Sequence, residues 1–308
     1  MLLKFGRKEL TASINLIKGI GRASMCTTKA SEHLKFETLA VTVPKPFVFH
    51  VELNRPDKLN ALSHLMWIEI KKCFEALSSE ADCRVVVVSA AGRIFTAGLD
   101  IKSATNTMQS FAEANDIARK AKILEELIRL YQQSMSSLEI CKKPVLTGIH
   151  SACIGAGVDL ITSADIRYCT NDAWFQVKEV DIGMAADVGT LQRLPRVIGS
   201  ESLARELCFT ARKFSADEAF RCGLVSKVFD DKESMLTGLL KTAEEIASKS
   251  PVAVQGTKSN IIYSRDHTVQ EGLERMIIWN QFMMQSEDFV TALVGQATKD
   301  DNIMFSKL

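Results

Sequence analysis

The stretch Ile154-Gly155-Ala156-Gly157-Val158-Asp159-Leu160 decides the fold of this chain. It follows residues 145–149, which the sequence predicts as a β-strand, and its two glycines predict a turn that opens a helix. Backbone N–H groups at such a helix N-terminus can face a developing negative charge and stabilise it. The third glycine of a dinucleotide-binding fingerprint is missing, so the motif predicts an anion-stabilising turn, or a simple turn, rather than nucleotide binding.

Strands and helices alternate on both sides of this turn. The order predicts a β/α core up to about residue 225, followed by a helical part that packs on another subunit. Ser63 is a candidate N-cap for the first helix of the core. Strands are expected over residues 39–43, 47–53, 84–89, 145–149, 166–169 and 173–175, and helices from residue 63 to 77, from about 111 to 138, and through most of 191–289.

The composition is that of a folded, water-soluble protein. Hydrophobic residues make up 46% and charged residues 24% of the 308 positions, which excludes a disordered or collagen-like chain. The 38 basic and 37 acidic residues leave a net charge of +1, so no global basic field favours nucleic acid. No apolar run approaches the roughly 18 to 20 residues of a membrane-spanning helix. We therefore expect neither a nucleic-acid partner nor a membrane span.

Both ends of the chain are similar to targeting signals. Residues 1 to about 30 are basic and amphipathic, with Glu9 as their single acid, which predicts a mitochondrial transit peptide; a solvated basic tail is the alternative. At the other end, Ser306-Lys307-Leu308 matches the peroxisomal address that an import receptor reads at the extreme C-terminus. Together they predict a protein of the mitochondrial matrix and the peroxisome, two organelles for which fatty-acid oxidation is an obvious shared chemistry.

A second glycine loop and three acids make the turn at Gly155 a candidate active site. The loop Ala97-Gly98-Leu99 could supply a further N–H donor, so that two donors form an oxyanion hole. Asp159, Glu179 and Asp187 are the candidate general acids and bases. Asp187 stands in a run of small and apolar residues, where burying it ionised would cost several kcal/mol, so we expect a raised pKa if it is buried.

Each acid also has a purely structural interpretation. A carboxylate can be a surface charge, a helix N-cap or half of an ion pair, and we prefer this interpretation for Asp165, Asp172 and Asp181.

Four ordered segments of the sequence resemble the crotonase (enoyl-CoA hydratase/isomerase) superfamily, over about residues 36 to 300. The resemblance implies an α/β fold, a crotonase-like ββα spiral core with a helical C-terminal trimerisation region, usually assembled as a hexamer of two trimers. Accordingly, we expect a targeting leader over 1–35, the core over 36–225 and the oligomerisation region over 226–308. The four segments are residues 54–62, 95–100, 155–160 and 189–195.

The resemblance also implies an acyl-CoA substrate whose thioester oxygen is held by the N–H groups of Leu99 and Ala156. Ala156 is a departure, because glycine is common there in the family, and Ser151 likewise stands where glycine is frequent. No metal or redox cofactor is expected, since CoA enters as part of the substrate. The implied substrate-binding residues are Ala61, near the adenine, together with Gly98, Leu99, Asp100, Ile101, Lys102 and Ala156.

The third acid favours one branch of the superfamily. Hydratases normally carry two glutamates at the positions of Asp159 and Glu179 and a small residue at that of Asp187, whereas members that isomerise 3,5-dienoyl-CoA to 2,4-dienoyl-CoA have an aspartate there. That reaction removes a proton from C2 and returns one at C6, so a pair of carboxyl groups suits it. We expect Glu179 as the base and Asp187 as the acid, while Asp159 orients or tunes them.

Two other functions stay open at this point. A 2-enoyl-CoA hydratase would use Asp159 and Glu179 to add water. An RNA-binding or scaffold homologue would need a basic exposed face, and the pairs Lys71-Lys72 and Lys142-Lys143 are a small signal for one.

Overall fold

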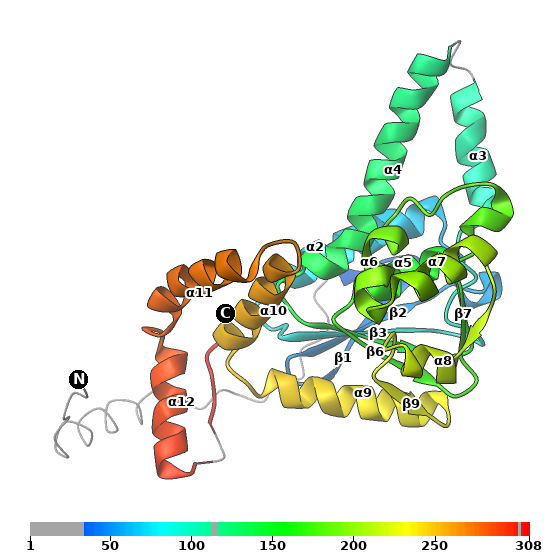
Figure 1. Cartoon of the computed structure of the whole chain (residues 1–308). Helices are drawn as coiled ribbons and strands as arrows, with labels where there is room; N and C mark the ends of the chain where they lie inside the picture. The colour runs from blue at the N-terminus through cyan, green and yellow to red at the C-terminus, as the bar shows by residue number, and fades with distance from the viewer. Residues whose placement is uncertain (1–33, 113–115, 301–302) are drawn as a thin grey trace.

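A six-stranded sheet is the centre of the computed structural model, which describes residues 34–112, 116–300 and 303–308 (Figure 1). The expected leader therefore lies almost entirely outside the described residues. β1 runs antiparallel to β2, and all other neighbouring strands are parallel. The strands, in their order across the sheet, are β1 (Leu39–Lys45), β2 (Val48–Leu53), β3 (Val85–Ala90), β4 (Val145–Ile149), β6 (Ile166–Thr170) and β9 (Lys227–Phe229).

The central strands are buried on both faces. All six residues of β3 are buried, as expected for a parallel strand covered on each side. Because side chains alternate along a strand, Val85 and Val87 pack with α9 (Lys232–Ala247), whereas Val86 and Val88 belong to the cluster on the opposite face. That cluster includes buried residues of α2 (His64–Ser79), α4 (Ile117–Ile140) and α5 (Ala156–Thr162).

Side-chain N-caps mark the first residues of α2 and α4. The Ser63 hydroxyl accepts the Met66 N–H, so the predicted N-cap of α2 is confirmed. The helix predicted from about 111 to 138 is confirmed over 117–138, but its predicted start is wrong, because residues 111 and 112 belong to a separate helix. The chain forms a hairpin of α3 (Ile101–Ala112) and α4, which projects away from the sheet in Figure 1, and Asp116 caps α4 by accepting the N–H groups of Ala118 and Arg119.

The chain beyond residue 225 still belongs to the core. β9 completes the sheet beside β6, and α9 covers one face of it, so the core continues through α9 past the expected boundary. The remaining elements around the site are a small sheet of β5 (Ala152–Ile154), β7 (Trp174–Gln176) and β8 (Phe214–Ser215), the 3-10 turns η2 (Pro56–Lys58) and η3 (Glu179–Ile182), and the helices α6 (Thr190–Ile198), α7 (Glu201–Thr210) and α8 (Ala216–Arg221).

Three C-terminal helices, α10 (Pro251–Ser264), α11 (Val269–Met283) and α12 (Glu287–Thr298), form an arm beside the core (Figure 1). Lys258 anchors the arm, because its buried Nζ lies 2.8 Å from Asp165 Oδ2. The structural interpretation of Asp165 is therefore confirmed. α11 has only Gly272 buried, so most of its surface faces away from the core. Within the described ranges, no helix is long and apolar enough to cross a membrane.

Candidate active site

Two loops that are far apart in the sequence run side by side at the candidate oxyanion hole. Thr96 forms a parallel bridge with β5: its N–H donates to the Ala152 carbonyl at 3.0 Å, and its carbonyl accepts the Ile154 N–H at 3.2 Å. Gly98 then approaches so closely that a Cβ there would lie 2.6 Å from the Ile154 carbonyl oxygen. Its φ of +83° also favours glycine.

This contact brings together the two predicted N–H donors. An ideal Cβ on Gly98 would lie 3.7 Å from the Ala156 nitrogen, and Leu99 is the next residue along the loop. Among the described residues, none accepts a backbone hydrogen bond from the N–H of Leu99 or of Ala156. Both groups are therefore available to a ligand oxygen.

Backbone angles explain the two departures from glycine. Ala156 is the first residue of α5 and has no positive φ, so alanine fits. The unusual backbone falls on Gly155, with φ 51° and ψ −119°. Ser151, in contrast, has φ 53°, a left-handed conformation in which glycine avoids the steric cost.

Arg55 and Asn60, which the sequence reasoning did not assign to the site, organise the predicted substrate loops. The Asn60 side chain is fully buried and accepts the Arg55 N–H while donating to the carbonyls of Ala91 and Ile94. The Arg55 guanidinium donates to the Ala61 carbonyl and to Asp100 Oδ2. Their signal was present in the Asn-Arg-Pro segment that carried the family resemblance.

The structure places the predicted substrate-binding residues around this connection. Leu62 exchanges backbone hydrogen bonds with Gly98 and Asp100, which joins the Ala61 segment to the Gly98 loop. Asp100 Oδ1 accepts the Ser103 N–H at 3.0 Å, so its carboxylate begins α3. Ile101 and Lys102 are exposed at the base of the α3–α4 hairpin.

Glu179 lies against the oxyanion turn. A Cβ on Gly155 would lie 3.2 Å from Glu179 Oε1, and the Gly155 N–H donates to the Gln176 carbonyl, which holds β7 and the start of η3 beside the turn. Glu179 Oε2 is buried without a hydrogen-bond partner among the described residues. A carboxylate oxygen in this state is poorly solvated and therefore more basic.

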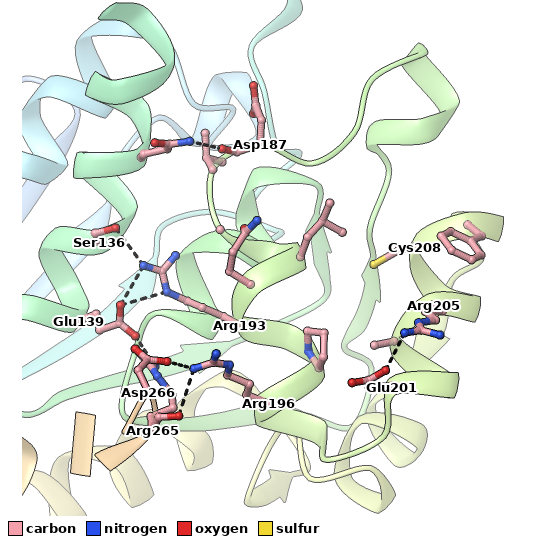
Figure 2. A pocket seen from close by; sticks show the side chains of 18 residues that line it. Ser136, Glu139, Asp187, Arg193, Arg196, Glu201, Arg205, Cys208, Arg265 and Asp266 are labelled. Atoms are coloured by element: carbon pink, nitrogen blue, oxygen red, sulfur yellow. Dashed lines mark hydrogen bonds and ion pairs between the residues drawn. The ribbon is translucent and has the colours of Figure 1, made fainter. Parts of the chain in front are cut away.

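Asp159 and Asp187 are connected through the start of α6. Asp159 is completely buried, and its Oδ1 accepts the Thr190 N–H at 2.5 Å. Asp187 is half-buried three residues before Thr190, and the Gln132 side chain on α4 donates to its backbone carbonyl at 2.8 Å. Asp187 also lines a cavity of about 950 Å³ between α4, α6 and α7 (Figure 2).

Burial shifts all three carboxyl groups toward neutral pH. Burial, together with the charge of Asp159, raises the pKa of Glu179 to about 7. Burial raises the pKa of Asp159 to about 6, with a further contribution from Asp187, although the Thr190 hydrogen bond opposes the rise. Burial also raises the pKa of Asp187. Because these charges affect one another, the three groups titrate as a coupled set suited to acid–base chemistry.

Residues 45–292 match the family model described as enoyl-CoA hydratase/isomerase. The chain belongs to this family. A solved structure titled as an enoyl-CoA hydratase from Bacillus anthracis has a TM-score of 0.78 and 27% identity, covering 88% of this chain and 99% of that one. The family and the crotonase-like α/β fold predicted from the sequence are thus confirmed.

Two curated relatives of this chain share the name of one reaction. A Rattus norvegicus protein named Delta(3,5)-Delta(2,4)-dienoyl-CoA isomerase, mitochondrial, is 52% identical to this chain, covering 98% of this chain and 94% of its own length. An Arabidopsis thaliana protein named Delta(3,5)-Delta(2,4)-dienoyl-CoA isomerase, peroxisomal, is 44% identical to this chain, and the match covers 82% of this chain and 90% of its own length.

The raised pKa of Glu179 predicts a pH-dependent stability. A carboxyl group with an ordinary pKa of 4.5 and a folded-state pKa of about 7 costs stability as the pH rises through this interval. Glu179→Gln removes that cost. We expect its melting temperature to exceed that of the wild type by roughly 3–6 °C at pH 8.5, and by much less at pH 5.

Asp181→Asn is the matched control, because Asp181 lies in the same turn but is exposed and paired with Lys178. It should show no such pH-dependent gain. A Glu179→Gln protein with the same gain at both pH values would show that Glu179 is not perturbed by burial. Differential scanning calorimetry measures both variants.

Proposed function

We propose that this enzyme converts 3,5-dienoyl-CoA to 2,4-dienoyl-CoA in the β-oxidation of unsaturated fatty acids. The observation that carries the proposal is the third acid: Asp187 stands beside the Asp159–Glu179 pair, joined to it through Thr190. The names of relatives up to 52% identical to this chain support the same reaction.

The substrate enters as an acyl-CoA thioester. Its carbonyl oxygen accepts the N–H groups of Leu99 and Ala156, which polarise the carbonyl and make the C2 protons acidic. Ala61 and the loop from Gly98 to Lys102 line the acyl-CoA site.

Proton transfer then proceeds in two steps. Glu179, ionised, removes a proton from C2, and the electron pair delocalises over the C3–C6 diene and the thioester oxygen to give a dienolate. Asp187, protonated, donates its proton to C6, which leaves double bonds at C2 and C4 in conjugation with the thioester. Afterwards Glu179 carries the proton and Asp187 the charge, so a proton must pass back before the next turnover.

Asp159 holds and tunes this pair. Its Oδ1 accepts the Thr190 N–H, three residues after Asp187 in the loop that leads into α6. Its charge helps to raise the pKa of Glu179. These steps use only carboxyl groups and backbone N–H groups, so we propose that the enzyme needs no metal or redox cofactor.

A 2-enoyl-CoA hydratase is the second candidate, since the family contains hydratases and the chain has acids at both positions that a hydratase uses. Asp187 separates the two reactions, because adding water needs no third acid. No observation on the described surface favours RNA binding or a scaffold role.

An ultraviolet assay tests the reaction. With 3,5-octadienoyl-CoA we expect the conjugated thioester band to appear, and with 2-octenoyl-CoA we expect little loss of that band. Asp187→Asn should lower kcat for isomerisation by roughly 10²–10⁴-fold, because the amide has no acidic proton to donate. Loss of absorbance with the second substrate alone would identify a hydratase.

The α11 surface supports a homo-oligomer, a trimer or a hexamer. Five of its apolar side chains are more than half exposed, a feature typical of a subunit interface. These are Val269 at 81%, Leu273 at 55%, Ile277 at 62%, Ile278 at 61% and Phe282 at 64% exposed.

Ile277→Asp should therefore shift the protein toward smaller species in analytical ultracentrifugation. Ile117→Asp is the control, since Ile117 is 85% exposed but lies on the α3–α4 hairpin. A wild-type monomer, or an Ile277→Asp protein that sediments like the wild type, would contradict the proposed interface.

We place the enzyme in mitochondria and peroxisomes, as the names of its relatives support. An import receptor would bind Ser306-Lys307-Leu308. In the structure Lys307 is paired with Asp82, and the Arg84 guanidinium donates to the carbonyls of Phe305 and Ser306.

A receptor that binds the Lys307 side chain would compete with Asp82 for it. Asp82→Asn should therefore tighten receptor binding by roughly 2–5-fold in fluorescence polarisation, while deletion of Leu308 should abolish it. Binding that survives the deletion would show that this tripeptide is not the address.

A further inference from the structure

A buried ion pair lies on the cavity wall beside the loop that carries Asp187. Arg193 Nη2 on α6 is 2.9 Å from Glu139 Oε2 on α4, and the two side chains are only 11% and 12% exposed. The same Nη2 donates to Ser136 Oγ at 2.9 Å, and Arg265 contacts the other Glu139 oxygen at 2.5 Å. Figure 2 shows this group below Asp187.

The Arg193 guanidinium packs against the backbone of that loop at Gly189. A Cβ on Gly189 would lie 1.9 Å from Arg193 Nη1, so the cation occupies the space where any other residue would carry its side chain. Gly189 has φ 138°, which glycine alone adopts readily. Arg193, held by Glu139 and Ser136 of α4, thus fills the space beside Gly189 in the 187–190 loop.

This loop sets the positions of two of the three acids. It begins at Asp187, and it ends at Thr190, whose N–H donates to Asp159 Oδ1. The charge of Arg193 also reaches the site: burial raises the pKa of Asp159, and the nearby guanidinium opposes that rise.

Two other arginines of the cavity, Arg205 and Arg196, lack these contacts. Arg205 pairs with Glu201 at 2.7 Å, but the two side chains are 68% and 73% exposed. Arg196 pairs with Asp266, and both side chains are about half exposed. Exposed pairs of this kind contribute little, whereas a planar guanidinium buried between a carboxylate and a loop fixes geometry.

We propose that Arg193 is a positioning residue of this enzyme: through Gly189 it holds the 187–190 loop, and with it Asp187 and Asp159, in the arrangement that proton transfer requires. The proposal rests on the proposed isomerase function and adds to it a residue that acts through the loop backbone. It assigns Arg193 two separable contributions, the shape of its contact with Gly189 and its positive charge near the acids.

Two substitutions separate these contributions. Arg193→Gln removes both, so kcat with 3,5-octadienoyl-CoA should fall by roughly 10–100-fold with KM changed less than about 3-fold. The coupled acids lose a nearby positive charge and bind protons more tightly, so the acid limb of the kcat profile should move to higher pH by roughly half a unit. Arg193→Lys keeps the charge but not the planar fork; it should lower kcat and leave the acid limb in place.

Arg205→Gln is the matched control and should retain the kcat and pH profile of the wild type. An Arg193→Gln enzyme with wild-type kcat, or one that loses kcat with an unmoved acid limb, would overturn the proposed role. A wild type without isomerase turnover would instead contradict the proposed function itself, and with it the role of Arg193.

Discussion

The contact of Gly98 with the Ile154 carbonyl is the constraint on which the active site depends. Only a residue without a side chain can bring these two loops to this distance, since a Cβ would lie 2.6 Å from the oxygen. The contact directs the N–H groups of Leu99 and Ala156 to one region, and Gly155 next to it gives Glu179 Oε1 its place. The proposed oxyanion hole and the proposed base are therefore positioned by the same few atoms of backbone.

The burial that shifts the pKa values of these acids also lowers the stability of the folded protein. Burying carboxyl groups raises the pKa of Glu179 to about 7 and that of Asp159 to about 6, so ionising them in the fold is costly. The site compensates with fixed dipoles and one cation: the Thr190 N–H binds Asp159, and Arg193 stands behind the loop between Asp187 and Thr190. Functional sites typically contain groups of this kind, whose burial is unfavourable for stability.

Local sequence signals predicted the parts of the site, and long-range contacts decided how they meet. The glycine turn, the strands around it and the three acids follow from patterns of a few residues. The break between α3 and α4 was missed because a single cap, Asp116, decides it. Arg193 lies in the 189–195 segment that carried the family resemblance, but its role was not assigned, since its partner Glu139 lies 54 residues away.

Other parts depend on the tertiary fold in the same way. Ser151 was noted only as standing where glycine is frequent, and its φ of 53° shows that the fold imposes a left-handed backbone there. The core extends past residue 225 because β9, a strand of three residues, pairs with β6. A strand this short gives little signal in the sequence before its partner strand is known.

Proton exchange at C2 is the measurement that tests most directly whether Glu179 and Asp187 divide the two proton transfers. With 3,5-octadienoyl-CoA in D₂O, ¹H NMR follows the C2 protons and the formation of the 2,4-diene separately. If Glu179 is the base and Asp187 the acid, Asp187→Asn exchanges the C2 protons but forms little 2,4-diene, and Glu179→Gln does neither. Exchange at the wild-type rate in Glu179→Gln, or full isomerisation in Asp187→Asn, would contradict this division.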